Sequence, residues 1–172
     1  MLVSKHDAAT LAFIITAILF TALIVAPTMN YAEFYESIEK LNLLVSNVSF
    51  TQESNDPPSI AITTTFTIVY PASYSGLKLR SLQISRATVH LDGENRTIRV
   101  SGQQYFYSDI PLNPRSNMTV QTIHVEEDNS AALDLAQLKD IQTQLVWNLQ
   151  CRILVDVFLE TPVDLNFDVS YP

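Results

Sequence analysis

The sequence contains few of the residues on which several common functions depend. It has one cysteine, three glycines, and ten lysines and arginines against eighteen aspartates and glutamates, for a formal net charge of −8. A single cysteine excludes a disulfide framework within one chain. The scarcity of glycine weakens a phosphate-loop interpretation. The acidic balance argues against nucleic acid as a partner, because phosphate binding needs clustered basic side chains.

A length of 172 residues allows one folded unit with one core, and the longest apolar run lies near its beginning. Residues 8–26 carry no charged side chain, and as a helix they would extend about 28 Å, close to a hydrocarbon core of about 30 Å. This length and composition predict a transmembrane helix. The side chains that we expect to anchor it in the membrane are Leu11, Phe13, Ile14, Leu19, Phe20 and Leu23.

Two other interpretations of this segment are a cleavable secretory signal and a buried core helix. A signal peptide normally has a shorter apolar region and small residues before the cleavage point, whereas Asn30 puts a bulky amide there. An uncleaved signal-anchor is therefore favoured. Lys5 precedes the span and no Lys or Arg follows it until Lys40. The positive-inside rule then predicts a cytoplasmic N-terminus and an extracytoplasmic C-terminal domain at the cell membrane.

Three N-glycosylation acceptor sequences are compatible with export. They begin at Asn47, Asn95 and Asn117, which are therefore candidate glycosylation sites.

The residues after the apolar run predict a stalk. Pro27 is expected to end or kink the membrane helix near its outer boundary. Acidic and apolar residues then alternate at helical spacing, which predicts an amphipathic stalk helix or, alternatively, an oligomerisation helix. The polar stretch 52–59 predicts a loop. The expected organisation is a cytoplasmic stub at 1–7, a transmembrane helix at 8–27, the stalk at 28–46 and a β-sandwich domain at 47–172.

The remainder of the chain alternates apolar and polar residues with a period of two, which predicts β-strands. The alternation changes parity within 77–91, and such changes predict β-bulges. One helix, capped by Asn129 or Ser130, is expected to run up to Leu145. About seven strands with one late helix predict an all-β fold, an immunoglobulin-like β-sandwich. The expected strands are residues 60–70, 77–91, 97–100, 105–110, 118–125, 145–159 and 163–171.

The last two expected strands form a hairpin that pairs odd residues with odd residues across 161–163. This register would place Glu160 opposite Asp164 and Asp156 opposite Asp168. Like charges directly opposite are unfavourable. The strands would therefore belong to different sheets, or water would screen the acids, or a cation would bridge them.

Five short segments occur along the chain in an order that allows comparison with a known domain. They are Val69-Tyr70-Pro71, Tyr74–Leu82, Val89–Asn95, Ile110-Pro111-Leu112 and Thr161-Pro162. This order resembles the group-2 late-embryogenesis-abundant domain, also called the water-stress and hypersensitive-response domain, over residues 44–172. The chain departs from that pattern at Tyr70-Pro71, where family members usually have Asn-Pro. The resemblance implies a single-pass membrane protein with its sandwich outside the cytosol, a link with stress tolerance, lipid binding, and no catalytic residues.

Few side chains suggest chemistry. Cys151 lies on the apolar parity of its strand, which predicts a buried structural thiol. His90 and His124 each lie between apolar neighbours, so both are expected to face solvent. Residues 126–128 are expected to form a solvated acidic loop before the helix. We therefore expect no catalytic, cofactor-binding or metal-binding residues, and an enzyme is disfavoured.

These observations favour a non-enzymatic, single-pass membrane protein that displays a β-sandwich outside the cytosol for binding or assembly. The expected partners are membrane lipid around the N-terminal helix and a protein partner or a second copy of the chain, with no nucleic acid. One alternative is a pilin-like or archaellum-stator-like structural subunit. Another is an accessory subunit of a larger membrane complex, packed through the small residues Ala8, Ala12 and Thr16 on one helix face.

Overall fold

The computed structural model describes residues 5–91, 97–156 and 162–172, and the chain divides into two units, Met1–Glu39 and Lys40–Pro172. The first unit contains the helix α1 (Lys5–Glu39). Within it, Thr10–Glu39 is long and apolar enough to cross a membrane, and an 18-residue window of it has a mean hydropathy of 2.4. Its large apolar side chains from Leu11 to Met29 are exposed, as expected of an anchor, whereas Phe34 and Ile38 near its end are buried. Those with more than half of their surface exposed include Leu11, Phe13, Leu19, Phe20 and Leu23, while Ile14 is 48% exposed.

Two expectations about the residues after the apolar run are corrected. The helix does not end at Pro27 but continues to Glu39, since a long helix tolerates the loss of one backbone hydrogen bond. Residues 42–46, expected to belong to the stalk helix, form the start of β1 (Asn42–Asn55). Leu43 is buried while Asn42 and Leu44 are exposed, and this alternation is that of a strand. The sandwich therefore begins at Asn42 rather than at residue 47.

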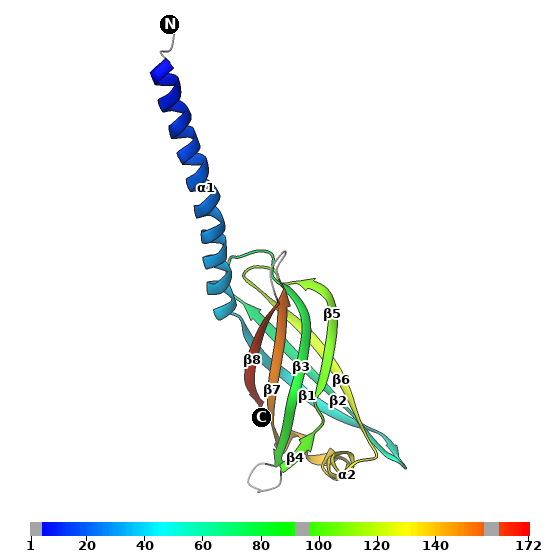
Figure 1. Ribbon diagram of the computed structural model, residues 1–172. Coiled ribbons are helices and arrows are strands. Elements are labelled where there is room, and N and C mark those ends of the chain that lie inside the picture. Colours follow the sequence, from blue (N-terminus) through cyan, green and yellow to red (C-terminus); the bar gives the residue numbers. More distant parts are fainter. Residues whose placement is uncertain (1–4, 92–96, 157–161) are drawn as a thin grey trace. The chain divides into compact units, whose positions relative to one another are not determined.

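The second unit is an antiparallel β-sandwich, which confirms the expected fold class (Figure 1). Sheet A contains β1, β2 (Pro58–Tyr70) and β6 (Ser116–Glu127) in the order β1-β2-β6. Sheet B has the order β4-β3-β7-β8, and β5 pairs with β3 on the same edge as β4. The described residues form eight strands where about seven were expected. The strands of sheet B are β3 (Lys78–Leu91), β4 (Thr97–Val100), β5 (Gln103–Pro111), β7 (Leu145–Asp156) and β8 (Val163–Tyr171).

The core lies between the two sheets and is built from the inward side chains of alternating strands. On β2, Ile60, Ile62, Phe66 and Ile68 are buried, while the threonines at 63, 65 and 67 are only partly exposed on the outer face. The expected loop at 52–59 is shorter than predicted, because β1 and β2 extend to Asn55 and from Pro58. Each buried Ile or Phe contributes about 1.5–3 kcal/mol of burial free energy, so the sheets are held face to face mainly by these rows.

The expected late helix is present in two short pieces, α2 (Ser130–Gln137) and the 3-10 helix η1 (Lys139–Gln144). Of the two expected caps, Asn129 is the N-cap of α2. Its side-chain oxygen accepts a hydrogen bond of 2.8 Å from the backbone N–H of Ala132. Such a cap satisfies a backbone donor that has no partner within the helix.

The register of β7 and β8 corrects the predicted pairing of acids. Odd residues do oppose odd residues, but Cys151 pairs with Phe167 and Val155 with Val163, so Asp164 lies opposite Leu154 and Asp168 opposite Gln150. The two strands are neighbours in one sheet, and no acid-on-acid pair arises among their described residues. Glu160 lies in 157–161, outside the described residues, as does the expected turn at 92–95. Asp164 instead forms a bidentate ion pair with Arg152.

Candidate functional site

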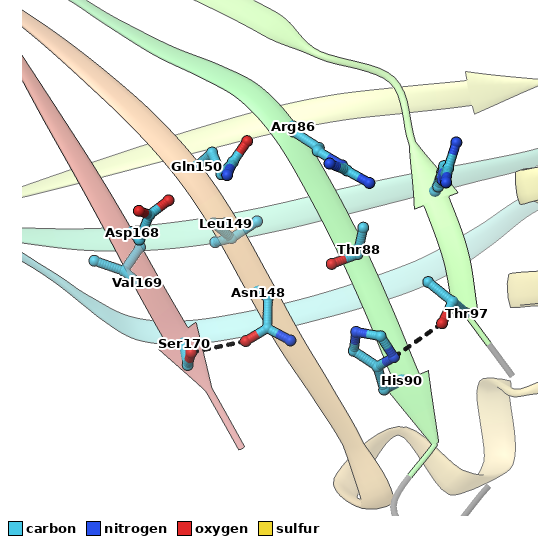
Figure 2. A pocket seen from close by; sticks show the side chains of 11 residues that line it. Arg86, Thr88, His90, Thr97, Asn148, Leu149, Gln150, Asp168, Val169 and Ser170 are labelled. Carbon is cyan, nitrogen blue, oxygen red and sulfur yellow. Dashed lines mark hydrogen bonds between the residues drawn. The ribbon is translucent and has the colours of Figure 1, made fainter. Parts of the chain in front are cut away.

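The outer face of sheet B is hollowed near the ends of β3 and β4, and this hollow, the sheet B concavity, has a volume of about 620 Å³ (Figure 2). Nine of its eleven lining residues are polar or charged. The lining residues are Arg86, Thr88, His90, Thr97, Arg99, Asn148, Leu149, Gln150, Asp168, Val169 and Ser170.

Strand register arranges the polar side chains of the concavity in rows across the sheet. The central row runs from Arg99 on β4 through Thr88 on β3 and Asn148 on β7 to Ser170 on β8. A neighbouring row contains Arg86, Gln150 and Asp168. Residues directly opposite on adjacent strands have Cβ atoms about 4.5–5.5 Å apart, so each row presents a continuous line of hydrogen-bonding groups.

A β-bulge in β3 gives Arg86 its orientation. The register with β7 shifts between Ile84 and Arg86. Before the shift, even-numbered side chains such as Ile84 are buried, whereas after it the even-numbered Arg86 is exposed. The Ser85 hydroxyl donates a hydrogen bond of 2.9 Å to the carbonyl of Gln150 and holds the bulge against β7. This confirms the bulge predicted from the change of parity within 77–91, and bulges commonly re-aim a side chain in this way.

Several polar contacts order the floor of the concavity, while its two guanidinium groups stay open. His90 Nδ1 and the Thr97 hydroxyl are 3.0 Å apart, and the Ser170 hydroxyl donates to Asn148 Oδ1 at 2.7 Å (Figure 2). Within the described part of the chain, neither Arg86 nor Arg99 has a hydrogen-bond or ion-pair partner. His90 does face outward, as the sequence predicted.

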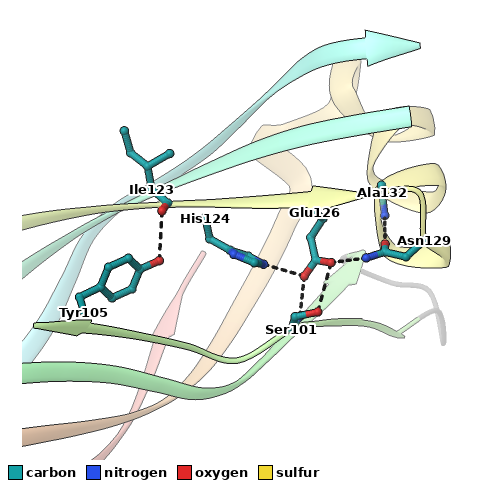
Figure 3. A network of polar contacts seen from close by, with 7 residues as sticks. All are labelled: Ser101, Tyr105, Ile123, His124, Glu126, Asn129 and Ala132. Carbon is teal, nitrogen blue, oxygen red and sulfur yellow. Dashed lines mark hydrogen bonds and ion pairs between the residues drawn. The ribbon is translucent and has the colours of Figure 1, made fainter. Parts of the chain in front are cut away.

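A second polar cluster lies between the sheets, around the carboxylate of Glu126 at the end of β6 (Figure 3). Glu126 is 1% exposed and accepts hydrogen bonds from the backbone N–H of Ser101 at 2.6 Å and from the Ser101 hydroxyl at 3.2 Å. His124 Nε2 lies 2.8 Å from the same carboxylate, and the Asn129 side-chain amide donates to it. The cluster therefore joins β6, the break between β4 and β5, and the cap of α2.

Electrostatics of this cluster favour an ionised carboxylate. Burial by itself would raise the pKa of Glu126, but the hydrogen bonds from His124, Ser101 and Asn129 outweigh that effect and leave the pKa below its usual value. The ionised carboxylate of Glu126 thus links the two sheets through its hydrogen bonds.

The positions of His124 and Glu126 correct two predictions. The alternation around His124 predicts that Ile123 and Val125 face inward. Instead, Ile123 is 61% and Val125 37% exposed, while the His124 side chain is only 12% exposed. The core-facing parity of β6 is even, set by Val120 and Thr122, which are buried. Glu126 belongs to the strand and not to a solvated loop. The signal that could have shown this is Val120, which shares parity with both residues.

The other candidate residues are located as follows. Cys151 is buried, as predicted, and burial together with the nearby charge of Asp168 raises the pKa of its thiol to about 12. Of the three candidate glycosylation sites, Asn47 and Asn117 are exposed on sheet A, and Asn95 lies outside the described residues. In the described part of the chain, no three His, Cys, Asp or Glu residues are grouped so that they could hold a metal ion.

Comparison with known proteins does not assign the chain to a family. No family model matches it, and no curated protein matches it. The expected membership of the group-2 late-embryogenesis-abundant domain is therefore without support from a family model. One similar solved structure is nevertheless that of a protein provisionally assigned as late-embryogenesis-abundant, with 12% identity and a TM-score of 0.35, over 91% of this chain and 86% of that one.

Two further solved structures are similar at a comparable level. A protein of Bordetella pertussis provisionally named ApaA has 10% identity and a TM-score of 0.43, over 76% of this chain and 91% of that one. A protein from Archaeoglobus fulgidus has 10% identity and a TM-score of 0.34, over 74% and 95%. At these values the comparisons add nothing to the fold and site described above.

Proposed function

We propose that this chain is a single-pass membrane protein that displays its β-sandwich outside the cytosol as a non-enzymatic binding module. The observation that carries the proposal is the apolar helix Thr10–Glu39, whose large apolar side chains from Leu11 to Met29 are exposed. Exposed Leu, Ile and Phe over a full span length are costly in water and favourable in a hydrocarbon core. Membrane lipid is therefore the environment that this helix fits.

The residues at the two ends of the helix support one orientation. Lys5 precedes the apolar run, and no Lys or Arg occurs between it and Lys40. At the other end Tyr31 and Tyr35 form an aromatic pair with ring centroids 4.7 Å apart and hydroxyls 2.9 Å apart. Tyrosines are enriched where a membrane meets water, and basic residues are enriched on the cytoplasmic side. The position of Lys5 favours a cytoplasmic N-terminus, and the two tyrosines are placed as expected of a membrane–water interface at the other end of the span.

The sandwich contributes the binding surface. Its buried groups are hydrogen-bonded or apolar, whereas the sheet B concavity gathers exposed polar and cationic side chains on one rigid face. Ligands usually bind at concave parts of a protein surface, where polar groups fix their orientation and give specificity. We therefore assign binding to the concavity and support of that surface to the Glu126 cluster.

The orientation can be tested with the full chain carrying a different epitope at each end. In intact cells, added protease should remove the C-terminal epitope and leave the N-terminal one, and permeabilised cells should lose both. A cytosolic marker protein should stay intact before permeabilisation. A C-terminal epitope that resists protease in intact cells, or a chain extracted from membranes by alkaline carbonate, would contradict the proposal.

A second function, assembly with another protein, is favoured by one observation. β6 is an edge strand of sheet A, and its outer face exposes Ile123 and Val125. Edge strands with apolar outward side chains are prone to contact other chains. Native electrophoresis of the protein in a mild detergent, with Ile123→Ser for comparison, would reveal a larger complex that the substitution weakens.

A further inference from the structure

We propose that the sheet B concavity binds an anionic saccharide, with Arg86 and Arg99 receiving its carboxylate groups. This inference rests on the proposed function, because it names the ligand of the same surface. It is carried by the position of the two guanidinium groups and by the hydrogen-bonding rows between them and β8.

The two arginines form a cationic pair on adjacent strands. Ala87 pairs with Val100 and Thr88 with Arg99, so Arg86 and Arg99 are diagonal neighbours, with backbones about 7–8 Å apart. Like charges at this separation repel each other, and within the described residues no acidic side chain pairs with either. The acid of the concavity, Asp168, is two strands from Arg86 in the same row, roughly 10 Å away. An anion between the arginines would relieve the repulsion.

The geometry of the guanidinium group favours a carboxylate. Arginine presents several N–H donors in a planar fork that matches the two oxygens of a carboxylate. Two forks on neighbouring strands can engage successive acidic groups of one chain or one group from two sides. Such charge-assisted hydrogen bonds are about twice as strong as neutral ones.

The rest of the concavity suits hydroxyl groups rather than acyl chains or bases. Thr88, Asn148, Gln150 and Ser170 offer both donors and acceptors along the rows. The apolar lining residues are Leu149 and Val169, and Leu149 is 2% exposed, so there is little surface for an acyl chain. Among the described lining residues, His90 supplies the one aromatic ring, and its Nδ1 lies 3.0 Å from the Thr97 hydroxyl, so the concavity lacks the series of aromatic side chains on which successive nucleic-acid bases stack.

The width of the polar surface across the sheet favours an oligosaccharide over a small anion. The central row crosses four strands, from Arg99 on β4 to Ser170 on β8, which at about 4.8 Å per strand is a width of roughly 14 Å. A single inorganic anion would contact only the arginine end. A saccharide chain can place its acid between Arg86 and Arg99 and its hydroxyls along Thr88, Asn148 and Ser170.

The test uses the full chain in nanodiscs of zwitterionic phosphatidylcholine, so that no anionic lipid or sugar-headed detergent competes. Calorimetric titration with an oligogalacturonate should show saturable binding that weakens as salt is raised. The methyl-esterified form of the same oligomer, which keeps the sugar chain and loses the charge, should not bind. Inorganic sulfate should bind much more weakly than the acidic oligomer.

Substitutions assign the binding to the named residues. Arg86→Gln and Arg99→Gln should each weaken binding about tenfold, the loss expected for one charge-assisted contact. Arg115→Gln, which removes the same charge from the loop before β6 and outside the concavity, should leave binding unchanged. Asp168→Asn should strengthen binding roughly twofold, as Coulomb's law gives for about 10 Å in water, and a misfolded variant could not produce this gain.

Four results would overturn the inference: no binding of the acidic oligomer, equal binding of the methyl ester, sulfate binding as tight as that of the oligomer, or equal losses in Arg115→Gln and Arg86→Gln. Its failure is distinguishable from failure of the proposed function. A chain that ignores acidic saccharides while its C-terminal epitope remains protease-accessible on intact cells refutes the ligand and leaves the displayed binding module in place.

Discussion

Glu126 brings a carboxylate into the interior of the sandwich, where its hydrogen-bond partners are Ser101, His124 and Asn129. Its contacts with Ser101 reach the break between β4 and β5, and Gly102, the next residue, lies against the bulge that turns Arg86 outward. A single buried side chain of sheet A is thus connected through two residues to the cationic end of the concavity on sheet B. We therefore expect a substitution of Glu126 to reach that surface through these contacts.

Glu126→Gln should destabilise the fold by about 2 kcal/mol, because an amide would put donors opposite the donors of Ser101 and Asn129. The pKa of Glu126 is lower in the folded chain than in the unfolded one. Its stabilisation is therefore complete above the unfolded pKa and is lost as the pH falls through the folded pKa. Below about pH 5, the free energy of unfolding should decrease more steeply in the wild type than in the variant.

Denaturant unfolding across pH measures this difference. The control is Glu127→Gln, since Glu127 is the exposed neighbour on the same strand. If the free energy of unfolding changes with pH in parallel for Glu126→Gln and the wild type, the ionised carboxylate does not stabilise the fold.

The sequence could predict some of these residues and not others, for reasons visible in their neighbours. Cys151 lies between apolar residues of the same parity, and Asn129 precedes a helical pattern, so burial and capping followed from local sequence alone. Glu126 could not be found in this way. A buried acid is recognisable only once its donors are known, and Ser101 is 25 residues away in the chain. The arginines of the concavity likewise meet only through strand pairing.

At the scale of the elements, β3 determines the shape of sheet B because it pairs with β7 along one edge and with β4 and β5 along the other. Its bulge lies opposite the Ser101–Gly102 break between those two strands. A Cβ atom added at Gly102 would meet the carbonyl oxygens of Ile84 and Ser85 at 2.9 Å. Close backbone approach at this point is what requires a glycine.

Gly102→Ala should therefore cost about 1–3 kcal/mol, as overpacking against rigid backbone does, and should weaken ligand binding by disturbing Arg86. Thermal unfolding and titration measure the two effects. Ser108→Ala, at an exposed position of β5, is the matched control. Wild-type stability in Gly102→Ala would mean that the bulge can shift at no cost.

The helix α1 makes an independent prediction. Leu19 is 58% and Leu23 70% exposed, and an arginine near the centre of a membrane span costs about 2.5–3.5 kcal/mol on insertion scales. Leu19→Arg and Leu23→Arg should each reduce the fraction of protein that stays with membranes after alkaline extraction. Leu133→Arg, at a leucine of α2 that is 54% exposed, should not. Full membrane retention in both helix variants would locate the anchor elsewhere.

The sequence predicted correctly which strand residues share a face, because the two-residue period decides that. It predicted wrongly which residues pair across β7 and β8, because the register of the two strands decides that. The alternation in β7 and β8 fixes which face each residue occupies. It leaves the pairing free to slide by even steps, so that Asp168 meets Gln150 and not Asp156. The stalk prediction failed at residues 42–46 because a few residues of mixed polarity fit both a helical and a strand period, and the buried Leu43 decides between them only in the folded chain.

At the scale of the whole molecule, the chain divides at Glu39 into a helix and a sandwich, each described as its own unit. All sheet pairing lies within Lys40–Pro172 among the described residues. The fold class was predictable because many strands alternate in polarity. The arrangement of five strands in sheet B was not, since β4 and β5 share one edge of β3 only through long-range pairing.

A fragment of residues 40–172 should accordingly fold without detergent, show the circular dichroism of a β protein and unfold cooperatively. The full chain should require detergent or lipid under the same conditions, because its apolar helix is exposed to water otherwise. A fragment that is aggregated or unstructured would show that the helix is needed for the sandwich to form.

The buried face of β7 also provides a natural optical probe. Trp147, the only tryptophan in the chain, is 2% exposed, pairs with Val89 and has its ring centroid 6.3 Å from that of Phe50. Its indole lies on the inner side of the sheet whose outer side carries the concavity. The emission wavelength of Trp147 should therefore shift when water reaches the core directly beneath that surface. It should stay constant while a ligand occupies the outer face, so that loss of fold can be distinguished from loss of affinity in a single sample.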